Sequence, residues 1–153
     1  MTEQRQDLPA SLTAPHTLEY TYTRSVGPVI GRFLGSLRER RLVGVRTESG
    51  RVLFPPQEYD PETGDPVGEF VEVGPAATVV TWAWVSEPRP NHPLARPFAW
   101  ALIRPDGADT AMLHAIDAID ESRVSTGMRV RVRWRDETAG EIHDIACFEP
   151  EGA

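Results

Sequence analysis

Side chains that could act as nucleophiles, acid–base catalysts or metal ligands are few and scattered. The 153 residues contain no nucleophile elbow, His-Glu-x-x-His motif, P-loop or dinucleotide-binding glycine fingerprint. All sixteen basic residues are arginine, and the lack of lysine in the sequence excludes Schiff-base chemistry. The single cysteine, Cys147, precedes Phe148 in a predicted strand and is interpreted as a small buried hydrophobic residue. The sequence therefore predicts that this chain is not itself an enzyme.

The segment 87–97 could bind an anionic ligand. It contains four prolines, which stiffen it, so we expect a projecting, preformed loop. His92, together with Arg89 and Arg96, could hold a phosphate group or a thioester-bearing ligand. Phe98, directly after the loop, is a candidate for lining the site of such a ligand. The alternative is that these side chains only stabilise the loop.

Two further histidines are weaker candidates. His114 lies in a predicted strand among apolar neighbours, so we expect a hydrogen-bonded structural histidine. His143 stands beside Asp144 at no spacing that indicates a metal or catalytic site.

Aromatic side chains gather on two neighbouring predicted strands. Period-two alternation puts Val80, Trp82 and Trp84 on one face, with Phe98 and Trp100 on the next strand. Such a cluster could stack on nucleic-acid bases, anchor a protein interface or fill a barrel core. We expect part of it to serve as an interface with a partner protein.

An arginine appears at every second position from 129 to 135. The intervening apolar residues predict one buried and one exposed face of a strand. The arginines are either a solvated face balanced by carboxylates or a strip for phosphates or an acidic partner. The four are Arg129, Arg131, Arg133 and Arg135.

The N-terminal third should contain one helix. We expect residues 1–17 to be a flexible arm. A short strand over 18–23 and a helix over 26–40 should follow, and together they form an N-terminal unit over 18–40. Ser25 could cap the helix, and Pro28 suits its first turn.

The remainder is predicted to be mainly β. We expect a domain over 71–153 that contains five strands, over 78–85, 98–104, 110–116, 128–135 and 142–148. Residues 120–123 are suited to a short helix between the third and fourth strands. Five strands with such a helical turn are typical of an OB-fold barrel.

Residues 41–70 have the layout of two metal-binding knuckles without their ligands. A zinc-binding knuckle needs a pair of thiolates with two residues between them, followed by glycine; glycine is present here after both pairs. The side chains at the four ligand positions bind zinc poorly or cannot bind it. They are Arg46, Ser49, Asp60 and Thr63. We predict a metal-free hairpin. Because so small a region rarely folds alone, it must pack on the barrel or on another protein.

This order of elements resembles the DUF35 family, in which a rubredoxin-like zinc ribbon precedes an OB-fold. The resemblance covers roughly residues 26–149 and rests on the helix with Phe33 and Leu37, the knuckle frame, Phe54-Pro55-Pro56 and the strand after Gly127. The loss of all four cysteines is its clear departure.

The resemblance implies a non-catalytic accessory subunit of a thiolase-like enzyme or aldolase. Such a subunit helps to form or open the acyl-CoA site. By analogy with the family, the resemblance also implies a role in lipid or steroid side-chain degradation. No cofactor is expected on this chain itself; acyl-CoA would be shared with the partner. The side chains expected at the partner interface are Phe33, Leu37, Phe54, Pro55, Pro56, Tyr59, Trp82 and Trp84.

Composition limits the remaining alternatives. The net charge of −7 makes a nucleic-acid-binding OB module the less favoured reading, because such binding needs concentrated positive charge. A free-standing acyl-CoA-binding protein or thioesterase is the other alternative. No apolar run is long enough to span a membrane, and a single cysteine suits the cytoplasm, which is the expected location.

Overall fold

The computed structural model describes residues 14–21 and 25–152. Residues 14–21 are exposed and form neither helix nor strand. The predicted strand over 18–23 is therefore wrong for residues 18–21, and its last two residues lie outside the described part, as do residues 1–13 of the expected arm.

Helix α1 (Gly27–Arg38) matches the predicted helix in its interior. Phe33 and Leu37, one turn apart, form its buried face, and Pro28 occupies the first turn. The N-cap is Val26, although Ser25 Oγ still accepts a hydrogen bond from the Gly27 backbone N–H at 3.3 Å. No helix within the described residues combines the length and the apolar character needed to cross a bilayer.

A three-stranded antiparallel sheet follows the helix. It consists of β1 (Leu42–Arg46), β2 (Val52–Leu53) and β3 (Phe70–Val73), in the order β2-β1-β3. Gly44 is required in β1 because a Cβ there would lie 2.6 Å from the Leu53 carbonyl oxygen. Since β3 pairs with β1, the sheet extends past the predicted boundary at residue 70.

The second sheet closes into a barrel. Its strands are β4 (Ala76–Val85), β5 (Phe98–Pro105), β6 (Met112–Ile116), β7 (Arg129–Trp134) and β8 (Ile145–Pro150), in the order β4-β5-β6-β8-β7. The 3₁₀ turn η1 (Glu121–Arg123) lies between β6 and β7, as predicted. Residues 142–144, predicted as strand, instead form a second 3₁₀ turn, η2 (Ile142–Asp144). The predicted OB-fold is confirmed.

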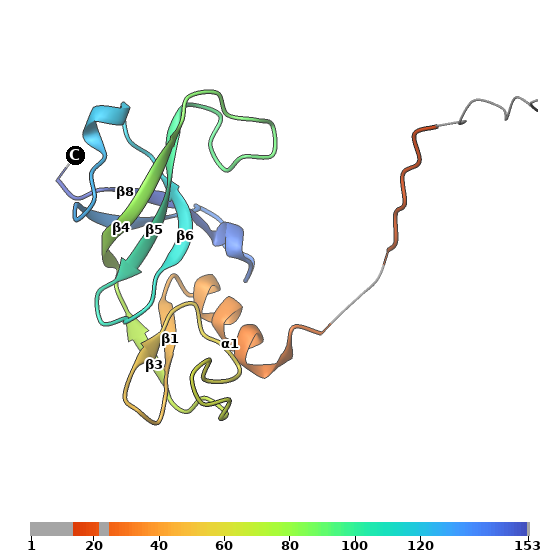
Figure 1. Ribbon diagram of the computed structural model, residues 1–153, viewed down its shortest axis with the longest axis vertical. Coiled ribbons are helices and arrows are strands. Elements are labelled where there is room, and N and C mark those ends of the chain that lie inside the picture. The colour runs from red at the N-terminus through yellow and green to blue at the C-terminus, as the bar shows by residue number, and fades with distance from the viewer. Residues whose placement is uncertain (1–13, 22–24, 153) are drawn as a thin grey trace, which may run out of the picture.

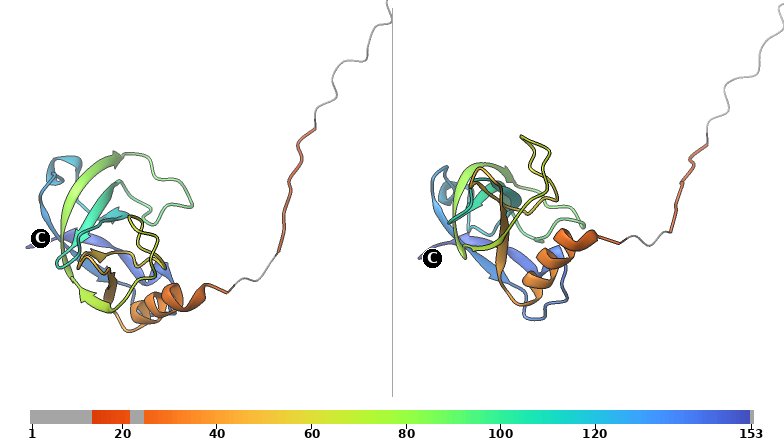
Figure 2. Two further views of the ribbon diagram at one scale, coloured as in Figure 1. Left: turned by 60° about the horizontal axis from the view of Figure 1, so that its bottom comes forward. Right: turned by 90° about the horizontal axis from the view of Figure 1, so that it is seen from below.

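One continuous core joins the two sheets. Figure 1 shows α1 and the three-stranded sheet at one end of the barrel, and Figure 2 shows the same elements from below. Phe33 and Val52 belong to the same cluster of buried residues as Phe148 in the barrel. The β2 backbone is also held by the barrel: Val52 N–H donates to Asp109 at 2.7 Å, and Phe54 N–H donates to Thr110 at 2.7 Å. The barrel is therefore the neighbour on which the small sheet packs.

Candidate functional site

Side-chain hydrogen bonds hold the two turns that contain the predicted ligand positions. Gly50 and Gly64, which end the turns, have positive φ of 88° and 79°. Ser49 shares a hydrogen bond with Thr47 at 2.8 Å. Asp60, which is buried, accepts one from the Glu62 N–H at 2.9 Å. These polar side chains give the two turns local order.

An ion pair between Arg51 and Glu62 connects the first turn with the second. Of the other two ligand positions, Arg46 donates to the Gly50 carbonyl at 3.1 Å, and Thr63 Oγ1 accepts from the Asp65 N–H at 3.2 Å. Within residues 14–21 and 25–152, no three His, Cys, Asp or Glu side chains are arranged to hold a metal ion. That a metal was lost from this hairpin stays a prediction.

Several side chains expected at a partner interface lie inside the protein. Phe33, Leu37 and Phe54 are 4%, 0% and 1% exposed, because α1 closes over the end of the barrel. Pro56 is also buried, so direct contact of these four with a partner was wrongly expected. Tyr59 is 58% exposed, and Pro55 is half-buried.

A β-bulge in β4 separates the aromatic residues from Val80. The register shifts between Val79 and Thr81, so Val80 becomes exposed while Trp82 and Trp84 turn inward. Both tryptophans are half-buried and pack against the main core. The expected shared face is therefore wrong, and each tryptophan is only partly accessible to a partner.

The loop between β4 and β5 extends beyond the strands in Figure 1, but its second half returns to the barrel. The His92 ring packs edge-to-face on Phe98 and Trp100, with centroid separations of 5.5 and 6.2 Å. His92 Nδ1 also accepts a hydrogen bond from the Arg89 N–H at 3.2 Å. Phe98 is fully buried, so it supports the loop and cannot line an open channel. Arg89 remains exposed.

Arg96 is already bound to the barrel. Its guanidinium forms an ion pair with Asp117, whose side chain is only 3% exposed. Arg133 contacts the same carboxylate at 2.8 Å and Glu149 at 3.3 Å. Arg96 and His92 therefore do not form a shared ligand site with Arg89.

Carboxylates neutralise most of the arginine row on β7. Arg129 makes two hydrogen bonds to Asp106, at 2.7 and 2.5 Å, and they hold the pKa of Asp106 below its usual value. Arg131 lies 3.5 Å from Glu151. These contacts favour the interpretation of the row as a solvated, charge-balanced face. Arg135 is the exception, because it has no ion pair with a carboxylate of the described residues.

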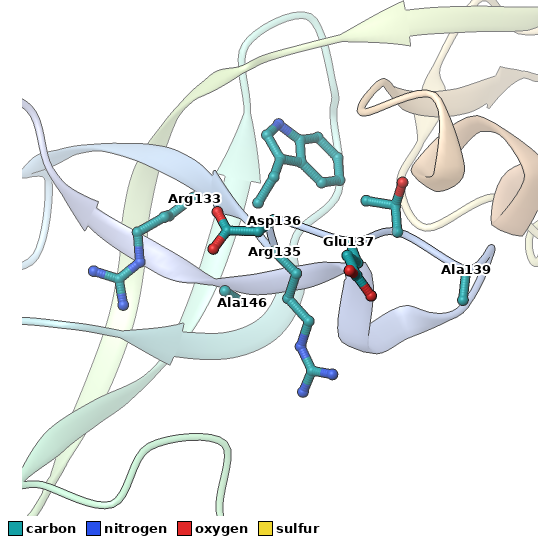
Figure 3. A pocket seen from close by; sticks show the side chains of 8 residues that line it. Arg133, Arg135, Asp136, Glu137, Ala139 and Ala146 are labelled. Carbon is teal, nitrogen blue, oxygen red and sulfur yellow. The ribbon is translucent and has the colours of Figure 1, made fainter.

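A groove and a cavity meet at Arg135. The groove has a volume of about 670 Å³ and follows residues 133–139 (Figure 3). The cavity, of about 190 Å³, is lined by Arg135, Pro93, Leu94, His114, Ile142, His143, Ile145 and Ala146. Arg135 and Ala146 line both spaces, which places a cationic side chain at the boundary between a polar groove and a mainly apolar cavity.

His114 is the unusual residue of the cavity. It is 9% exposed, its ring packs on Phe148, and Nδ1 has no hydrogen-bond partner. The expected hydrogen bonding is therefore absent at this nitrogen. Burial lowers the pKa of His114 to about 4, so the ring is neutral at pH 7. Sequence spacing gave no sign that His143 would lie at the same cavity.

Cys147 is buried in a second, smaller cluster with Phe98 and Ala115. Burial raises the pKa of its thiol to about 11, which keeps it protonated and unreactive at neutral pH. Its interpretation as a buried hydrophobic residue is confirmed.

Comparison with known proteins supports the family resemblance. Residues 70–135 match the model of the C-terminal OB-fold domain of ChsH2. A curated relative, a DUF35 domain-containing scaffold protein of Pyrococcus furiosus, is 25% identical over 107 residues, which cover 69% of this chain and 78% of the relative.

Two solved structures share the fold. A DUF35 family protein of unknown function from Sulfolobus solfataricus has a TM-score of 0.57 and 21% identity, with 69% of this chain and 78% of that chain covered. The Ltp2–ChsH2(DUF35) aldolase has a TM-score of 0.60 and 19% identity, with 84% of this chain and 98% of that chain covered.

Proposed function

We propose that this chain, a member of the DUF35 family, is a non-catalytic accessory subunit of a thiolase-like enzyme or aldolase. The observation that carries the proposal is its similarity to nearly the whole length of a chain of the Ltp2–ChsH2(DUF35) aldolase. The partner would supply the carbon–carbon cleavage chemistry. This chain would help to form or open the partner's acyl-CoA site, in the cytoplasm and in lipid or steroid side-chain degradation.

The first half of α1 and the loop before Asp60 make the best docking surface for that partner. Val26 and Tyr59 are 51% and 58% exposed, and Val26, Ile30 and Glu58 line a hollow of about 420 Å³. Exposed apolar and aromatic side chains around a hollow are typical of protein interfaces. The proposed docking surface is still on the helix and the hairpin, as expected from the sequence. It consists of exposed residues and does not include the buried Phe33.

The loop between β4 and β5 would border the acyl-CoA channel of the complex. His92 fixes its position by packing on Phe98 and Trp100, so the loop presents Arg89 without a large ordering cost. Arg89 is exposed and could bind a phosphate group of CoA.

Affinity purification of this chain from its native cell tests the proposal. We expect a thiolase-like protein or aldolase in stable stoichiometric amount. With the purified pair, Tyr59→Ala should weaken assembly about tenfold or more, as a central aromatic at an interface does. Leu113→Ala, which truncates a 59% exposed side chain on the barrel, is the matched control. If both variants bound the partner with equal affinity, the proposed docking surface would be wrong.

The alternatives predict different results for the isolated chain. Calorimetric binding of acyl-CoA, or release of free thiol from it, would favour a free-standing binding protein or thioesterase. Retention on heparin with salt-dependent binding of single strands would favour a nucleic-acid-binding OB module. Recovery of the chain alone, together with either result, would overturn the accessory role.

A further inference from the structure

The three-stranded sheet has one covered edge and one open edge. At the covered edge, the Val52 N–H in β2 donates to the Asp109 side chain at 2.7 Å, and its carbonyl accepts from the Asp109 N–H at 2.8 Å. At the other edge, β3 has no neighbouring strand among residues 14–21 and 25–152. β3 also contains no proline and no bulge, which are common protections of an exposed edge, so its outer side is suited to pair with a further strand.

We propose that β3 pairs antiparallel with β3 of a second copy of this chain, so that the two small sheets join into one continuous sheet. Phe70 of each copy would lie opposite Glu72 of the other, and the two Val71 residues would meet at the twofold axis. This inference does not depend on the accessory role proposed above.

The hydrogen bonds between β1 and β3 determine which backbone groups face outward. The Arg46 N–H donates to the Glu69 carbonyl at 2.8 Å. Because bonded and non-bonded pairs alternate along antiparallel strands, Val71 also bonds to β1. The N–H and C=O groups of Phe70 and Glu72 therefore face away from the sheet. In the proposed dimer, each Phe70 lies opposite a Glu72, and both pairs can exchange N–H···O bonds.

Side-chain charges favour this register over its neighbours. Arg32 Cζ lies 4.2 Å from the centroid of the Phe70 ring. Opposite residues of antiparallel strands have Cβ atoms about 5 Å apart, so this guanidinium would reach the Glu72 carboxylate of the second copy. Glu72 contacts Arg41 at 3.5 Å, yet its side chain is 61% exposed and can accept a second guanidinium.

The two neighbouring registers lack this match. One centred on Glu72 would put two carboxylates directly opposite each other, which is unfavourable. One centred on Phe70 would put Glu72 opposite Gly68 and would form no such ion pairs. Charge complementarity therefore selects a second copy in one register.

The helices leave room for the joined sheet. α1 packs over β1, and a groove of about 560 Å³ beside it is lined in part by Arg32, Phe70 and Glu72. With the usual spacing between strands, β1 of the two copies would lie about 14 Å apart. Packed helices have axes about 8–10 Å apart, so the two copies of α1 would not collide. The space between them would hold the two arginines and their carboxylate partners.

Sedimentation equilibrium of the full chain over a range of concentrations tests the dimer. We expect a monomer–dimer equilibrium in the high-micromolar range, because an edge of four residues gives a small interface. Hydrogen exchange followed by NMR gives a second readout. The backbone amides of Phe70 and Glu72 should gain protection as the concentration rises.

Charge reversal tests the register. Arg32→Glu and Glu72→Arg should each weaken self-association about tenfold or more, because like charges would then face each other across the axis. An equal mixture of the two variants should form a heterodimer about as tightly as the unmodified chain, since opposite charges again meet at both pairs. The matched controls Arg104→Glu and Glu87→Arg make the same charge changes at exposed positions outside α1 and β3. Neither control, alone or mixed, should change association.

Four results would overturn the proposal. One is a chain that stays monomeric at every concentration. Another is protection of the Phe70 and Glu72 amides in the monomer, which would mean that a segment of the same chain covers the edge. A dimer that neither charge reversal weakens would form through another surface. Failure of the mixed variants to associate would exclude the proposed register.

Discussion

At the scale of single residues, His114 should make stability depend on pH. Burial, with a smaller contribution from nearby His143, lowers its folded-state pKa to about 4, whereas an unfolded histidine titrates near 6.5. Arg135 also lines the cavity. Between about pH 6.5 and about pH 4 the unfolded state therefore binds a proton that the native state does not. The free energy of unfolding should fall as pH falls through this window, by up to about 3 kcal/mol.

Urea denaturation at about pH 7.5 and about pH 4.5 measures this effect. In His114→Gln, which removes the titrating group and keeps a polar side chain, most of the difference between the two pH values should disappear. Asp106 and Asp144, whose pKa values lie below the ordinary carboxyl value, also stabilise the fold less as pH falls, but the variant keeps both groups, so their effect is the same in the two proteins. An unchanged pH dependence in the variant would show that another group is responsible.

At the scale of elements, substitutions on the buried side of α1 should lower stability, whereas a substitution at the exposed docking surface should not. Phe33 is 4% exposed, and its ring lies edge-to-face on Phe54 with a centroid distance of 6.0 Å. Phe33→Ala should therefore lower the free energy of unfolding by about 3–5 kcal/mol. Tyr59→Ala, on the exposed side, should change it by less than about 0.5 kcal/mol. Denaturant titrations of both variants measure these changes in the free energy of unfolding. A small change for Phe33→Ala would show that α1 is not docked on the core.

The elements themselves were mostly predictable from the sequence. Alternation located the barrel strands, and the Pro28 and Phe33 spacing located α1, because these patterns reflect burial on one face. The β4 bulge was not predictable, since inserting one residue, Val80, changes the face of every later side chain without changing composition. Residues 142–144 resemble a strand in composition, yet the Asp144 carboxylate accepts N–H bonds from Ala139, Gly140 and Glu141 and fixes a turn.

At the scale of the whole molecule, the candidate sites were harder to predict. An apolar helix face indicates that something covers Phe33 and Leu37, but only the fold decides that the barrel of the same chain does so. Likewise, His114 and Arg135 are 21 positions apart on different elements, and no local pattern connects them. The arginine row looked uniform in sequence. Its members differ because Arg135 lines a cavity, whereas Arg129 and Arg133 lie near carboxylates.

The continuous core leads to a prediction for the whole molecule. Val52 of the small sheet is 4% exposed in the same cluster as Val130 and Phe148 of the barrel. The two sheets should therefore unfold together, in one cooperative transition. All four tryptophans, Trp82, Trp84, Trp100 and Trp134, lie in barrel strands, so their fluorescence reports on the barrel, while circular dichroism follows the whole chain.

Val52→Ala in the small sheet should lower the stability measured by both signals equally, by about 2 kcal/mol. The matched control is Val80→Ala in the barrel, which truncates a 42% exposed side chain and should leave both transitions within about 0.5 kcal/mol of the unmodified chain. If Val52→Ala shifts circular dichroism but leaves the tryptophan transition in place, the small sheet is an independent unit. In that case its stability would have to come from a partner rather than from the barrel. Coincident shifts would instead mean that the sheet is stabilised by the barrel, leaving the exposed side of α1 and Tyr59 available to a partner.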